Sequence, residues 1–477
     1  MTFSSTRGGV KNASFEEVLF SGFAVDGGLF MPEKIPQIDS KTLLSWSSLP
    51  YIELVKEICA LFIPVDVMPR QDINDVINTA FSRFRHKDII NLARLKDKLN
   101  ILELWHGMTY AFKDLALSCV GQFLQYFLNK RNKHVTVLVG TAGDTGSAAI
   151  ESVRGLKWID IIVMLPKGRC TRIQELQMTT VIEDNVTVFS VDGTSDEIDG
   201  IIRKLFADTA FAKKHNLMSL NSINWCRIMV QIAHFFYAYF VCATSKLEDS
   251  LAVVEVVVPT GGAGNITAGC IARKMGLPVQ LVAAVNENDI LHRTVLHGDF
   301  SLAESVKASL SSAMDIQEPY NLERIFWLLS GMDSPLIKKM MEEFEKSKRL
   351  QLPAYLHKSI KDNVTSCTVS DADVIHTIRH CWDENHYLLC PHTAVAVTYH
   401  YRQSDIISKS IARCCLATAS AVKFPEAVQK AGLTPEVTTD IKMLEEKSTR
   451  FAVMKKEDEW EQILRDTVEA IAIRRES

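Results

Sequence analysis

The sequence predicts an α/β protein with mostly parallel sheets wrapped by helices. Short runs rich in Val and Ile alternate with longer stretches whose apolar residues recur at three- and four-residue spacing. Such nearly continuous apolar runs are typical of strands buried on both faces, and their alternation with helices is typical of parallel β-α-β units. The strand-like runs span residues 134–140, 159–166, 185–191, 253–259 and 279–285.

Length and element order predict how the chain is divided. At 477 residues the chain exceeds the size of a single hydrophobic core, so two or three lobes are expected. Residues 1–96 carry helical patterns at 49–63 and 72–84, separated by a proline-bounded break. We therefore expect residues 1–96 to form a small, separate N-terminal lobe.

The strand-like runs begin after this lobe. We expect residues 97–430 to form a catalytic core of two α/β lobes, with a helical insertion near residues 319–386. A last strand-like run at residues 412–422 precedes a charged helical tail over residues 431–477.

Composition and charge exclude several classes of function. The chain has 53 basic and 57 acidic side chains, so no overall field would attract nucleic acid or an anionic membrane. The longest apolar run, residues 234–243, is about half of the roughly 20 residues that span a bilayer, and it predicts a buried helix. The N-terminus lacks the apolar segment of a secretory signal, and the 11 cysteines form no CxxC pair. We expect a cytoplasmic protein in a reducing compartment.

Two junctions join a strand to a helix through a glycine-rich loop, at residues 134–150 and 253–269. Glycines let the backbone approach a ligand closely, and the free amide groups at a helix start favour an anion. Neither loop has the GxGxxG or GxxxxGK[ST] spacing of nucleotide-binding proteins. Each loop is therefore either an anion cradle or a structural turn.

The segment ELWHGMTYAFKDLAL, residues 103–117, places Lys113 and Asp114 among aromatic and aliphatic residues. An apolar environment lowers the pKa of a lysine and makes its neutral amine accessible for covalent chemistry. The alternative is a surface lysine whose stem lies on apolar neighbours.

The ordered motifs resemble those of threonine synthase, a fold type II pyridoxal-phosphate enzyme, and most closely its vertebrate threonine synthase-like branch. The resemblance covers most of the chain. Its motifs are SSTRGG (4–9), DGGLFMPE (26–33), ELWHGMTYAFKD (103–114), GTAGDTGSAA (140–149), PKG (166–168), IQELQMTT (173–180), NSINWCRI (221–228), PTGGAGNITAG (259–269), KMGLP (274–278), PHTAVA (391–396) and LATASAVKFPEAV (416–428).

This resemblance implies pyridoxal 5'-phosphate as cofactor and Lys113 as the lysine that carries it. It implies that Asp144 lies against the 3-hydroxyl of the cofactor and that Thr418 meets its pyridine nitrogen. A neutral hydroxyl partner leaves that nitrogen unprotonated, which favours elimination over transamination. The implied cradle for the cofactor phosphate is Gly261, Gly262, Ala263, Gly264 and Asn265.

The resemblance also implies a set of substrate-binding residues. Arginine suits such a set because its planar fork binds phosphate oxygens in pairs. Thr141, Gly143 and Thr145 would bind the substrate carboxylate. The substrate phosphate would be held by Ser5, Thr6, Arg7, Lys167, Asn221, Ser222, Asn224 and Arg227, some of which are alternatively ordinary caps and surface charges.

Several departures from the family pattern remove polar groups. Ala142 stands where the family has serine, Cys390 where aspartate is frequent, and Ser420, Ala421 and Val422 where it has His-Pro-Ala. The family's GNFG phosphate loop is here Gly261 to Gly264, with the sequence GGAG. Adding water stereospecifically at Cβ needs a positioned water and proton relay, whereas elimination needs less. The departures therefore favour elimination.

We predict a phospho-lyase that converts O-phosphohomoserine and O-phosphothreonine into 2-oxobutyrate, ammonia and phosphate. The alternatives are a true threonine synthase and a catalytically silent relative with a binding or signalling role. A nucleotide-dependent dehydrogenase is disfavoured by the missing GxGxxG. His376 and His380 lie four residues apart without a third ligand, so we expect no metal. The expected partner is a small phosphorylated amino acid, and the sequence leaves monomer and homodimer open.

Overall fold

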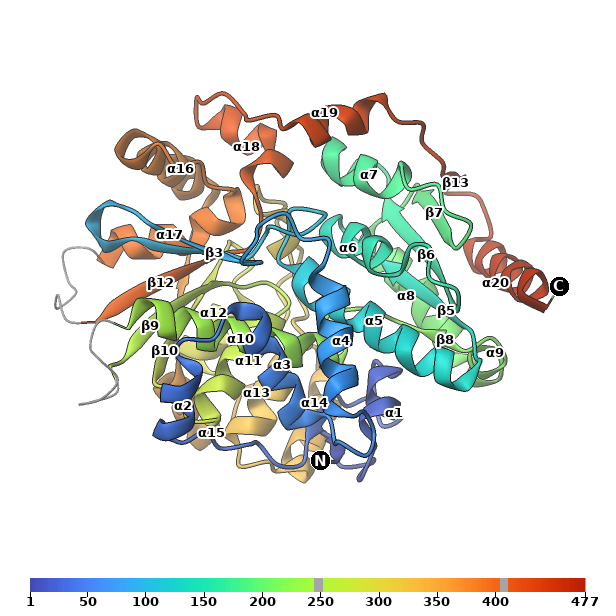
Figure 1. Cartoon of the computed structure of the whole chain (residues 1–477), viewed down its shortest axis with the longest axis horizontal. Helices are drawn as coiled ribbons and strands as arrows, with labels where there is room; N and C mark the ends of the chain where they lie inside the picture. Colours follow the sequence, from blue (N-terminus) through green and yellow to red (C-terminus); the bar gives the residue numbers. More distant parts are fainter. Residues whose placement is uncertain (244–251, 404–410, 477) are drawn as a thin grey trace.

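The computed structural model describes residues 1–243, 252–403 and 411–476. It contains two mostly parallel sheets, which lie on opposite sides of the view in Figure 1, with helices around and between them. A third sheet pairs β1 with β2 near the N-terminus; these strands span Phe3–Ser5 and Phe30–Pro32. The α/β architecture expected from the sequence is confirmed.

The larger sheet has six strands, and all neighbouring pairs are parallel except β3 with β4. Although β12 follows most of the other elements in the chain, it lies between β9 and β4 in the middle of the sheet. The strand order is β11 (Val364–Thr368), β10 (Val279–Val285), β9 (Val254–Pro259), β12 (Ala412–Ala417), β4 (Asn100–Glu103) and β3 (Asn91–Arg94).

The second sheet has five strands and is entirely parallel. Every residue of β6 is buried, which agrees with the continuous apolar run that predicted it. The strand order is β13 (Ala452–Met454), β7 (Val186–Val191), β6 (Ile159–Pro166), β5 (Val135–Gly140) and β8 (Leu217–Met218).

Helices cover the sheets and fill the space between them (Figure 1). In the first half they are α1 (Phe15–Leu19), α2 (Ser40–Trp46), α3 (Tyr51–Phe62), α4 (Arg70–Phe81), α5 (Lys113–Arg131), α6 (Asp144–Val153), α7 (Arg172–Thr179), α8 (Ser195–Ala207), α9 (Thr209–Lys214) and α10 (Trp225–Cys242). In the second half they are α11 (Gly264–Lys274), α12 (Ile290–His297), α13 (Leu322–Leu329), α14 (Ser334–Ser347), α15 (Ala354–Asn363), α16 (Asp371–Asn385), α17 (Pro391–Gln403), α18 (Pro425–Lys430), α19 (Thr439–Glu446) and α20 (Trp460–Glu476). Three short 3-10 turns are η1 (Lys96–Lys98), η2 (Ser312–Met314) and η3 (Ala421–Lys423).

The core of the protein is centred on α10, which packs against α3, α5 and α11. By length and composition α10 is apolar enough to cross a bilayer, but 83% of it is buried inside the protein. The apolar run at residues 234–243 is thus part of a buried helix, as predicted. The N-terminal helices α3 and α4 share one continuous apolar core with α5 and α10.

One strand lies inside the stretch expected to be a helical insertion. Helices α13 to α16 occupy most of residues 319–386, but β11 interrupts them and pairs in parallel with β10. Its sequence VTSCT is short and only partly buried because β11 is an edge strand. The sequence pattern was therefore too weak to reveal it.

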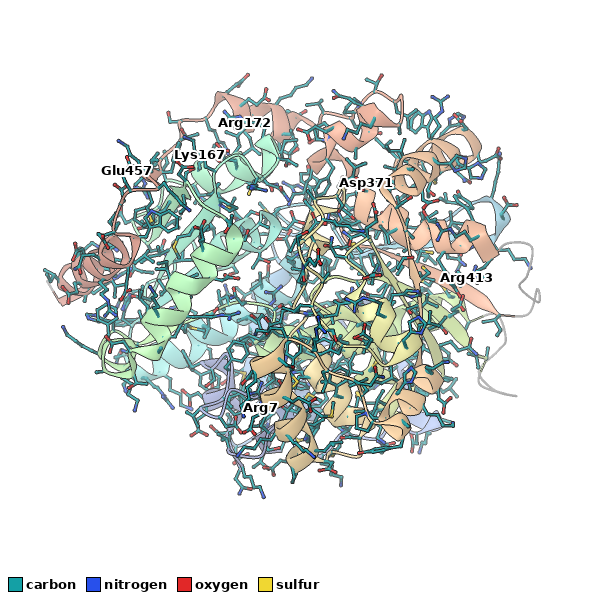
Figure 2. All side chains as sticks on the ribbon, turned by 180° about the vertical axis from the view of Figure 1, so that it is seen from behind. Arg7, Lys167, Arg172, Asp371, Arg413 and Glu457 are labelled. Atoms are coloured by element: carbon teal, nitrogen blue, oxygen red, sulfur yellow. The ribbon has the colours of Figure 1, made fainter. Side chains whose placement is uncertain are left out.

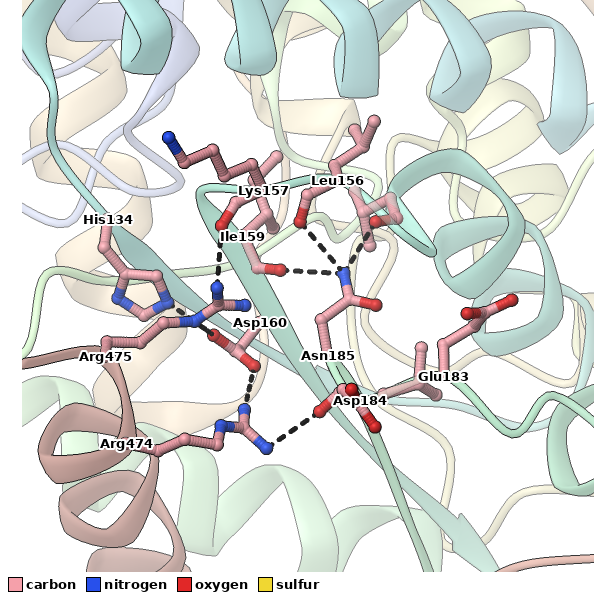
Figure 3. A network of polar contacts seen from close by, with 12 residues as sticks. His134, Leu156, Lys157, Ile159, Asp160, Glu183, Asp184, Asn185, Arg474 and Arg475 are labelled. Carbon is pink, nitrogen blue, oxygen red and sulfur yellow. Dashed lines mark hydrogen bonds and ion pairs between the residues drawn. The ribbon is translucent and has the colours of Figure 1, made fainter. Parts of the chain in front are cut away.

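A buried carboxylate fastens the C-terminal helix to the second sheet (Figure 3). Asp160 in β6 is almost fully buried, and it forms ion pairs with His134 at 2.6 Å, with Arg475 of α20 at 2.7 Å, and with Arg474. Burial opposes the charged form, but the bonds from His134 and Arg475 lower the pKa of Asp160. The expected helical tail therefore packs on the sheet, and it also contributes β13 to that sheet.

Candidate active site

Lys113 is the first residue of α5, at the end of a loop that runs alongside the segment after β12. Phe112 donates its backbone N–H to the Thr418 carbonyl at 2.7 Å, and Ser420 donates to the Tyr110 carbonyl at 3.0 Å. Tyr110 has a positive φ of 59°, which is uncommon for a residue with a side chain. These backbone bonds fix the position at which Lys113 leaves the loop.

The Lys113 amine is largely buried and has charged side chains close to it. Its Nζ is 3.9 Å from Asp144 Oδ2 and 5.1 Å from the centre of the Phe112 ring, and 16% of the side chain is exposed. Burial lowers the pKa of Lys113, Asp144 opposes this, and the nearby cations Arg227 and Lys423 lower it further. The structure therefore favours a buried lysine with a lowered pKa over the surface-lysine alternative.

The first glycine loop connects β5 to α6 and carries Asp144 at the start of the helix. Thr141 Oγ1 accepts hydrogen bonds from the amides of Gly143 at 3.0 Å and Gly146 at 2.9 Å. Gly143 has φ of 138°, and a Cβ atom there would lie 2.5 Å from Gln174 Cδ, so only glycine fits. The loop is rigid and narrow, and it is held by its own side chains.

Asp144 is buried and forms ion pairs with two lysines. Its Oδ1 lies 2.6 Å from Lys423 Nζ and accepts a bond from Gln174 Nε2 at 2.9 Å, while Oδ2 faces Lys113. Burial alone would raise its pKa, but the ammonium groups of Lys423 and Lys113 hold the pKa of Asp144 well below its usual value. Asp144 is therefore a permanent carboxylate in the middle of the site.

The second glycine loop connects β9 to α11. Ala263 is left-handed with φ of 63°, and a Cβ at Gly261 would lie 2.7 Å from Met314 Cα. The first bond of this helical turn runs from Thr267 N to the Ala263 carbonyl, so the amides of Gly264 and Asn265 have no acceptor within the helix. The loop presents backbone donors at a helix start, which is a site for an anion.

Asn265 also connects this loop to α10. His234 Nε2 donates to Asn265 Oδ1 at 2.8 Å, and burial lowers the pKa of His234 to about 4, so its ring is neutral. Asn265 Nδ2 is buried and has no hydrogen-bond partner among the residues that the structure describes. The side-chain amide of Asn265 is therefore a further donor that could bind an anion at this loop.

Comparisons with known proteins identify this arrangement. The models for the threonine synthase N terminus, the pyridoxal-phosphate dependent enzyme and the threonine synthase C-terminal region match residues 2–81, 88–416 and 393–465. Threonine synthase-like 2 of Xenopus laevis is 62% identical over 475 residues, which cover 100% of both chains. The chain belongs to the threonine synthase family of pyridoxal-phosphate enzymes.

Solved structures agree with this family. The threonine synthase structure from yeast matches with a TM-score of 0.91 at 36% identity, and the match covers 98% of each chain. The PLP-bound threonine synthase from Brucella melitensis matches with a TM-score of 0.91 at 31% identity, again over 98% of each chain. The fold is fold type II, as the sequence predicted, and the cofactor is pyridoxal 5'-phosphate.

The residues of this chain fit that cofactor. The loop from Gly261 to Asn265 has backbone donors and a free amide that would hold its phosphate, and Lys113 has an amine of lowered pKa that would bind its carbonyl carbon. Thr418 lies at the end of β12, and its backbone carbonyl is bonded to the residue before Lys113. The second glycine loop follows β9, Thr418 follows β12 and the segment that leads to Lys113 follows β4, and these three strands are neighbours in the larger sheet. The first glycine loop follows β5 of the second sheet, and its Asp144 faces Lys113.

Arg227 stands out among the residues predicted to bind substrate phosphate. It is 3% exposed at the start of α10, and its Nη1 donates to the Leu220 carbonyl at 2.9 Å. Its Nε is buried without a partner among the described residues, and burial lowers the pKa of Arg227 to about 10. Ser222 lies nearby, since a Cβ at Gly262 would be 3.7 Å from Ser222 Oγ. A buried arginine without a carboxylate partner is a site for an anion.

The N-terminal residues of the predicted phosphate set have other partners. Arg7 binds Glu323 through Nη2 at 3.0 Å and Glu345 through Nη1 at 2.7 Å, while Ser5 donates to Asp26 and Thr6 to Glu323. A guanidinium that already binds two carboxylates has little remaining attraction for phosphate. The structure therefore gives these three residues a structural role in place of the predicted one.

Lys167 and Asn224 also differ from the prediction. Lys167 is exposed after β6, and Figure 2 shows it far from Arg7, so the two cannot hold the same phosphate. Asn224 caps α10 through its side-chain oxygen, and its amide donates to the Leu19 carbonyl at 2.9 Å. Asn221 lies three residues before this cap and accepts its backbone N–H at 3.1 Å. Of the predicted set, Arg227 lies near Lys113 and Ser222 lies beside the second glycine loop.

Two buried side chains of the site were not identified from the sequence. Lys423 follows β12 and is paired with Asp144, as described above. His392, in α17, accepts the Ala313 N–H at Nε2, and burial lowers the pKa of His392 to about 4; its Nδ1 has no partner within the described ranges. A lysine inside the apolar segment SAVKF was the only signal for Lys423. No group of three or more metal-ligating side chains occurs among the described residues.

Proposed function

We propose that the protein is a phospho-lyase that acts on O-phosphohomoserine and O-phosphothreonine. The observation that carries the proposal is the buried guanidinium of Arg227, which has no carboxylate partner among the described residues and lies close enough to Lys113 to lower its pKa. A substrate with a phosphate group would supply the missing negative charge. The overall reaction consumes one water and yields 2-oxobutyrate, ammonia and inorganic phosphate from either substrate.

The roles of the residues follow from their positions. When bound, the cofactor supplies the electron sink that stabilises negative charge at Cα of the substrate. Lys113 would take the Cα proton of the substrate as a general base. Amide groups of the loop from Thr141 to Thr145 would hold the substrate carboxylate, and Arg227 would hold the phosphate until the C–O bond breaks.

Three residues support elimination without the later addition of water. Ala142 is exposed at the first glycine loop and has no hydroxyl group to position a water. Cys390 is buried, and its sulfur accepts the Thr393 N–H at 3.3 Å, as a cap of α17. Ser420 caps η3 through a bond from Val422 N. Cys390 and Ser420 have structural partners, and none of the three residues adds a carboxylate or an imidazole to the site.

A product assay tests the proposal. The holoenzyme is incubated with O-phosphohomoserine, and phosphate, ammonia, 2-oxobutyrate and threonine are quantified in the same mixture. We expect equal amounts of phosphate and 2-oxobutyrate with little threonine, and threonine as the main product would identify a synthase. Lys113→Ala should abolish turnover, and borohydride reduction with peptide mapping should find the cofactor on Lys113 in the unmodified chain.

Arg227 is tested separately from Lys113. Arg227→Gln should raise KM for both phosphorylated substrates by about tenfold to a hundredfold, because a charge-assisted bond contributes roughly 1.5 to 3 kcal/mol. Arg227→Lys keeps the charge and should retain part of the affinity. Unchanged KM in both variants, with the cofactor bound, would place the substrate phosphate elsewhere.

We further propose that the enzyme works in the cytoplasm as a monomer or homodimer on this small dissolved substrate. Light scattering coupled to gel filtration measures the mass of the holoenzyme directly. A mass above that of two chains would contradict this part of the proposal.

A further inference from the structure

Lys423 is a lysine at a completely buried position. It ends η3, directly after β12, and its side chain is completely buried. Its Nζ lies 2.6 Å from Asp144 Oδ1. Moving an ammonium group out of water costs several kcal/mol even when it is paired, and well-packed apolar residues often replace such pairs without loss of stability. The ion pair therefore calls for a role other than holding the fold together.

The backbone holds Lys423 in a fixed relation to Lys113. Residues 111 and 419 form an antiparallel bridge between the two segments, and Phe112 and Thr418 are bonded directly. Lys423 itself donates its backbone N–H to the Ser420 carbonyl at 3.3 Å. The two lysines thus extend from paired segments toward the same carboxylate.

Asp144 lies closer to Lys423 than to Lys113. The contact with Lys423 is 2.6 Å, whereas that with Lys113 is 3.9 Å, and Gln174 donates to the oxygen that faces Lys423. The attraction between unit charges falls with distance, so Asp144 attracts Lys423 more strongly than Lys113, while Lys423 repels a positive charge on Lys113. The remaining charged groups around Lys113 are Arg227 on α10 and Asp114 on α5, with His392 of α17 facing the same cluster.

We propose that Lys423 is a positioning residue for Lys113: its ammonium group occupies the Asp144 carboxylate and repels a second positive charge, so that the Lys113 amine stays uncharged and reactive. This inference rests on the proposed role of Lys113 as the cofactor lysine. It deepens that proposal, because it names the group that keeps the amine in the form that can bond to the cofactor.

The test is the titration of Lys113 in the full-length chain after the cofactor has been removed with hydroxylamine. Trace acetylation at a series of pH values, followed by peptide mapping, gives the midpoint of the Lys113 amine. In Lys423→Met the midpoint should rise by about one to three pH units, since Asp144 then faces Lys113 alone. Labelling of Lys113 near neutral pH should fall at least about tenfold. A midpoint that is unchanged or lower would overturn the proposal.

Gln174→Leu is the matched control. It removes a neutral donor from the same oxygen of Asp144, so it loosens the carboxylate without changing the charge. Its midpoint should stay within about half a pH unit of the unmodified chain, and a rise equal to that of Lys423→Met would show that only the geometry of Asp144 matters. Rebinding of pyridoxal phosphate, followed by visible absorbance, should slow at neutral pH in Lys423→Met alone.

Lys423→Gln gives a second answer if Lys423→Met does not fold. Its neutral amide can still donate to Asp144, but the positive charge is gone, so the Lys113 midpoint should rise as in Lys423→Met. A midpoint that is unchanged or lower in Lys423→Gln would show that the charge of Lys423 does not act on Lys113, and the proposal would be wrong. Peptide mapping of the borohydride-reduced holoenzyme separates this result from an error about the cofactor lysine, since such an error would place the cofactor on a different peptide.

Discussion

Asp114, the neighbour of the cofactor lysine, offers a prediction that depends on no ligand. It is 2% exposed and accepts two bonds from Thr109, from the backbone N–H at 2.8 Å and from the hydroxyl at 2.7 Å. Burial raises the pKa of Asp114 from 3.8 to about 6, and the Thr109 bonds lower it only in part. Because the folded pKa exceeds the unfolded one, this group stabilises the fold below about pH 4 and loses that contribution as pH rises through 6.

Asp114→Asn removes the titration and keeps the contacts. The amide oxygen can accept the Thr109 N–H, and the amide nitrogen can donate to the rotated Thr109 hydroxyl. A difference of about two pKa units corresponds to roughly 3 kcal/mol. The free energy of unfolding of the variant, relative to the unmodified chain, should therefore increase by about 3 kcal/mol between pH 4 and pH 7.

Urea unfolding of both chains at several pH values measures this difference. Asp66→Asn, at an exposed position, is the matched control and should show no change with pH. A difference for Asp114→Asn that is constant with pH, or that decreases as pH rises, would refute the reasoning about burial.

Substitutions at three other sites test separate parts of the structure. Gly264→Asp places a charge beside the cofactor phosphate, and at an effective dielectric of about 20 a contact near 4 Å costs about 4 kcal/mol, so cofactor affinity in a fluorescence titration should fall about a thousandfold. Its Cβ has room, at 3.4 Å from Asn321 Nδ2, so Gly264→Asn should fold and bind within about tenfold. Asp160→Asn should lower the melting temperature by several degrees, because Arg474 and Arg475 lose a buried partner. Tyr110→Phe removes the hydroxyl that binds Asp440 at 2.6 Å and should cost about 1 kcal/mol in urea unfolding.

The outcomes that would contradict these predictions are distinct. Equal cofactor affinity in Gly264→Asp and Gly264→Asn would move the phosphate away from this loop. An unchanged melting temperature in Asp160→Asn would mean that α20 is held by its apolar contacts alone. An unchanged unfolding free energy in Tyr110→Phe would mean that the bond to Asp440 contributes nothing beyond what water supplies.

The Tyr110 hydroxyl connects the loop before Lys113 to the C-terminal helix α19. Asp440, in α19, accepts bonds from Tyr110 and from Arg85, and the Arg85 guanidinium lies 4.2 Å from the centre of the Tyr110 ring. Figure 1 shows α19 passing over the top of the molecule toward α7, and Ile441 packs with Tyr110 and Val422. The C-terminal segment thus contacts both chain segments that carry the active-site lysines.

The sequence predicted those features that depend on nearby residues. The strands β5, β6, β9 and β10 were found because strands buried on both faces are apolar throughout. The two glycine loops and Lys113 were found because a strand, a glycine run and a helix follow one another in the chain. The short edge strand β11 carried no such pattern.

Other features depend on residues that are distant in sequence. Arg7 is paired with the carboxylates of Glu323 and Glu345, which are more than 300 positions away in the sequence. The sequence could therefore not show that the charge of Arg7 is already neutralised. The link between Asp144 and Lys423 is equally non-local. Propensity and spacing describe neighbours along the chain, whereas ion pairs of this kind appear only when the tertiary fold is known.

The place of β12 in the larger sheet has a consequence for how the protein is made. Residues 412–417 fill the gap between β9 and β4, and they are followed by Lys423, which completes the charge cluster. A ribosome that has released residue 400 has therefore produced a chain with an open sheet and an unfinished site. Domains usually fold as units during synthesis, but this one can close only near the end of translation, and its long-range pairing makes folding slow. Nascent chains should expose the facing edges of β9 and β4 from about residue 259 until β12 is made at residues 412–417, and unpaired edges of this kind are prone to aggregation.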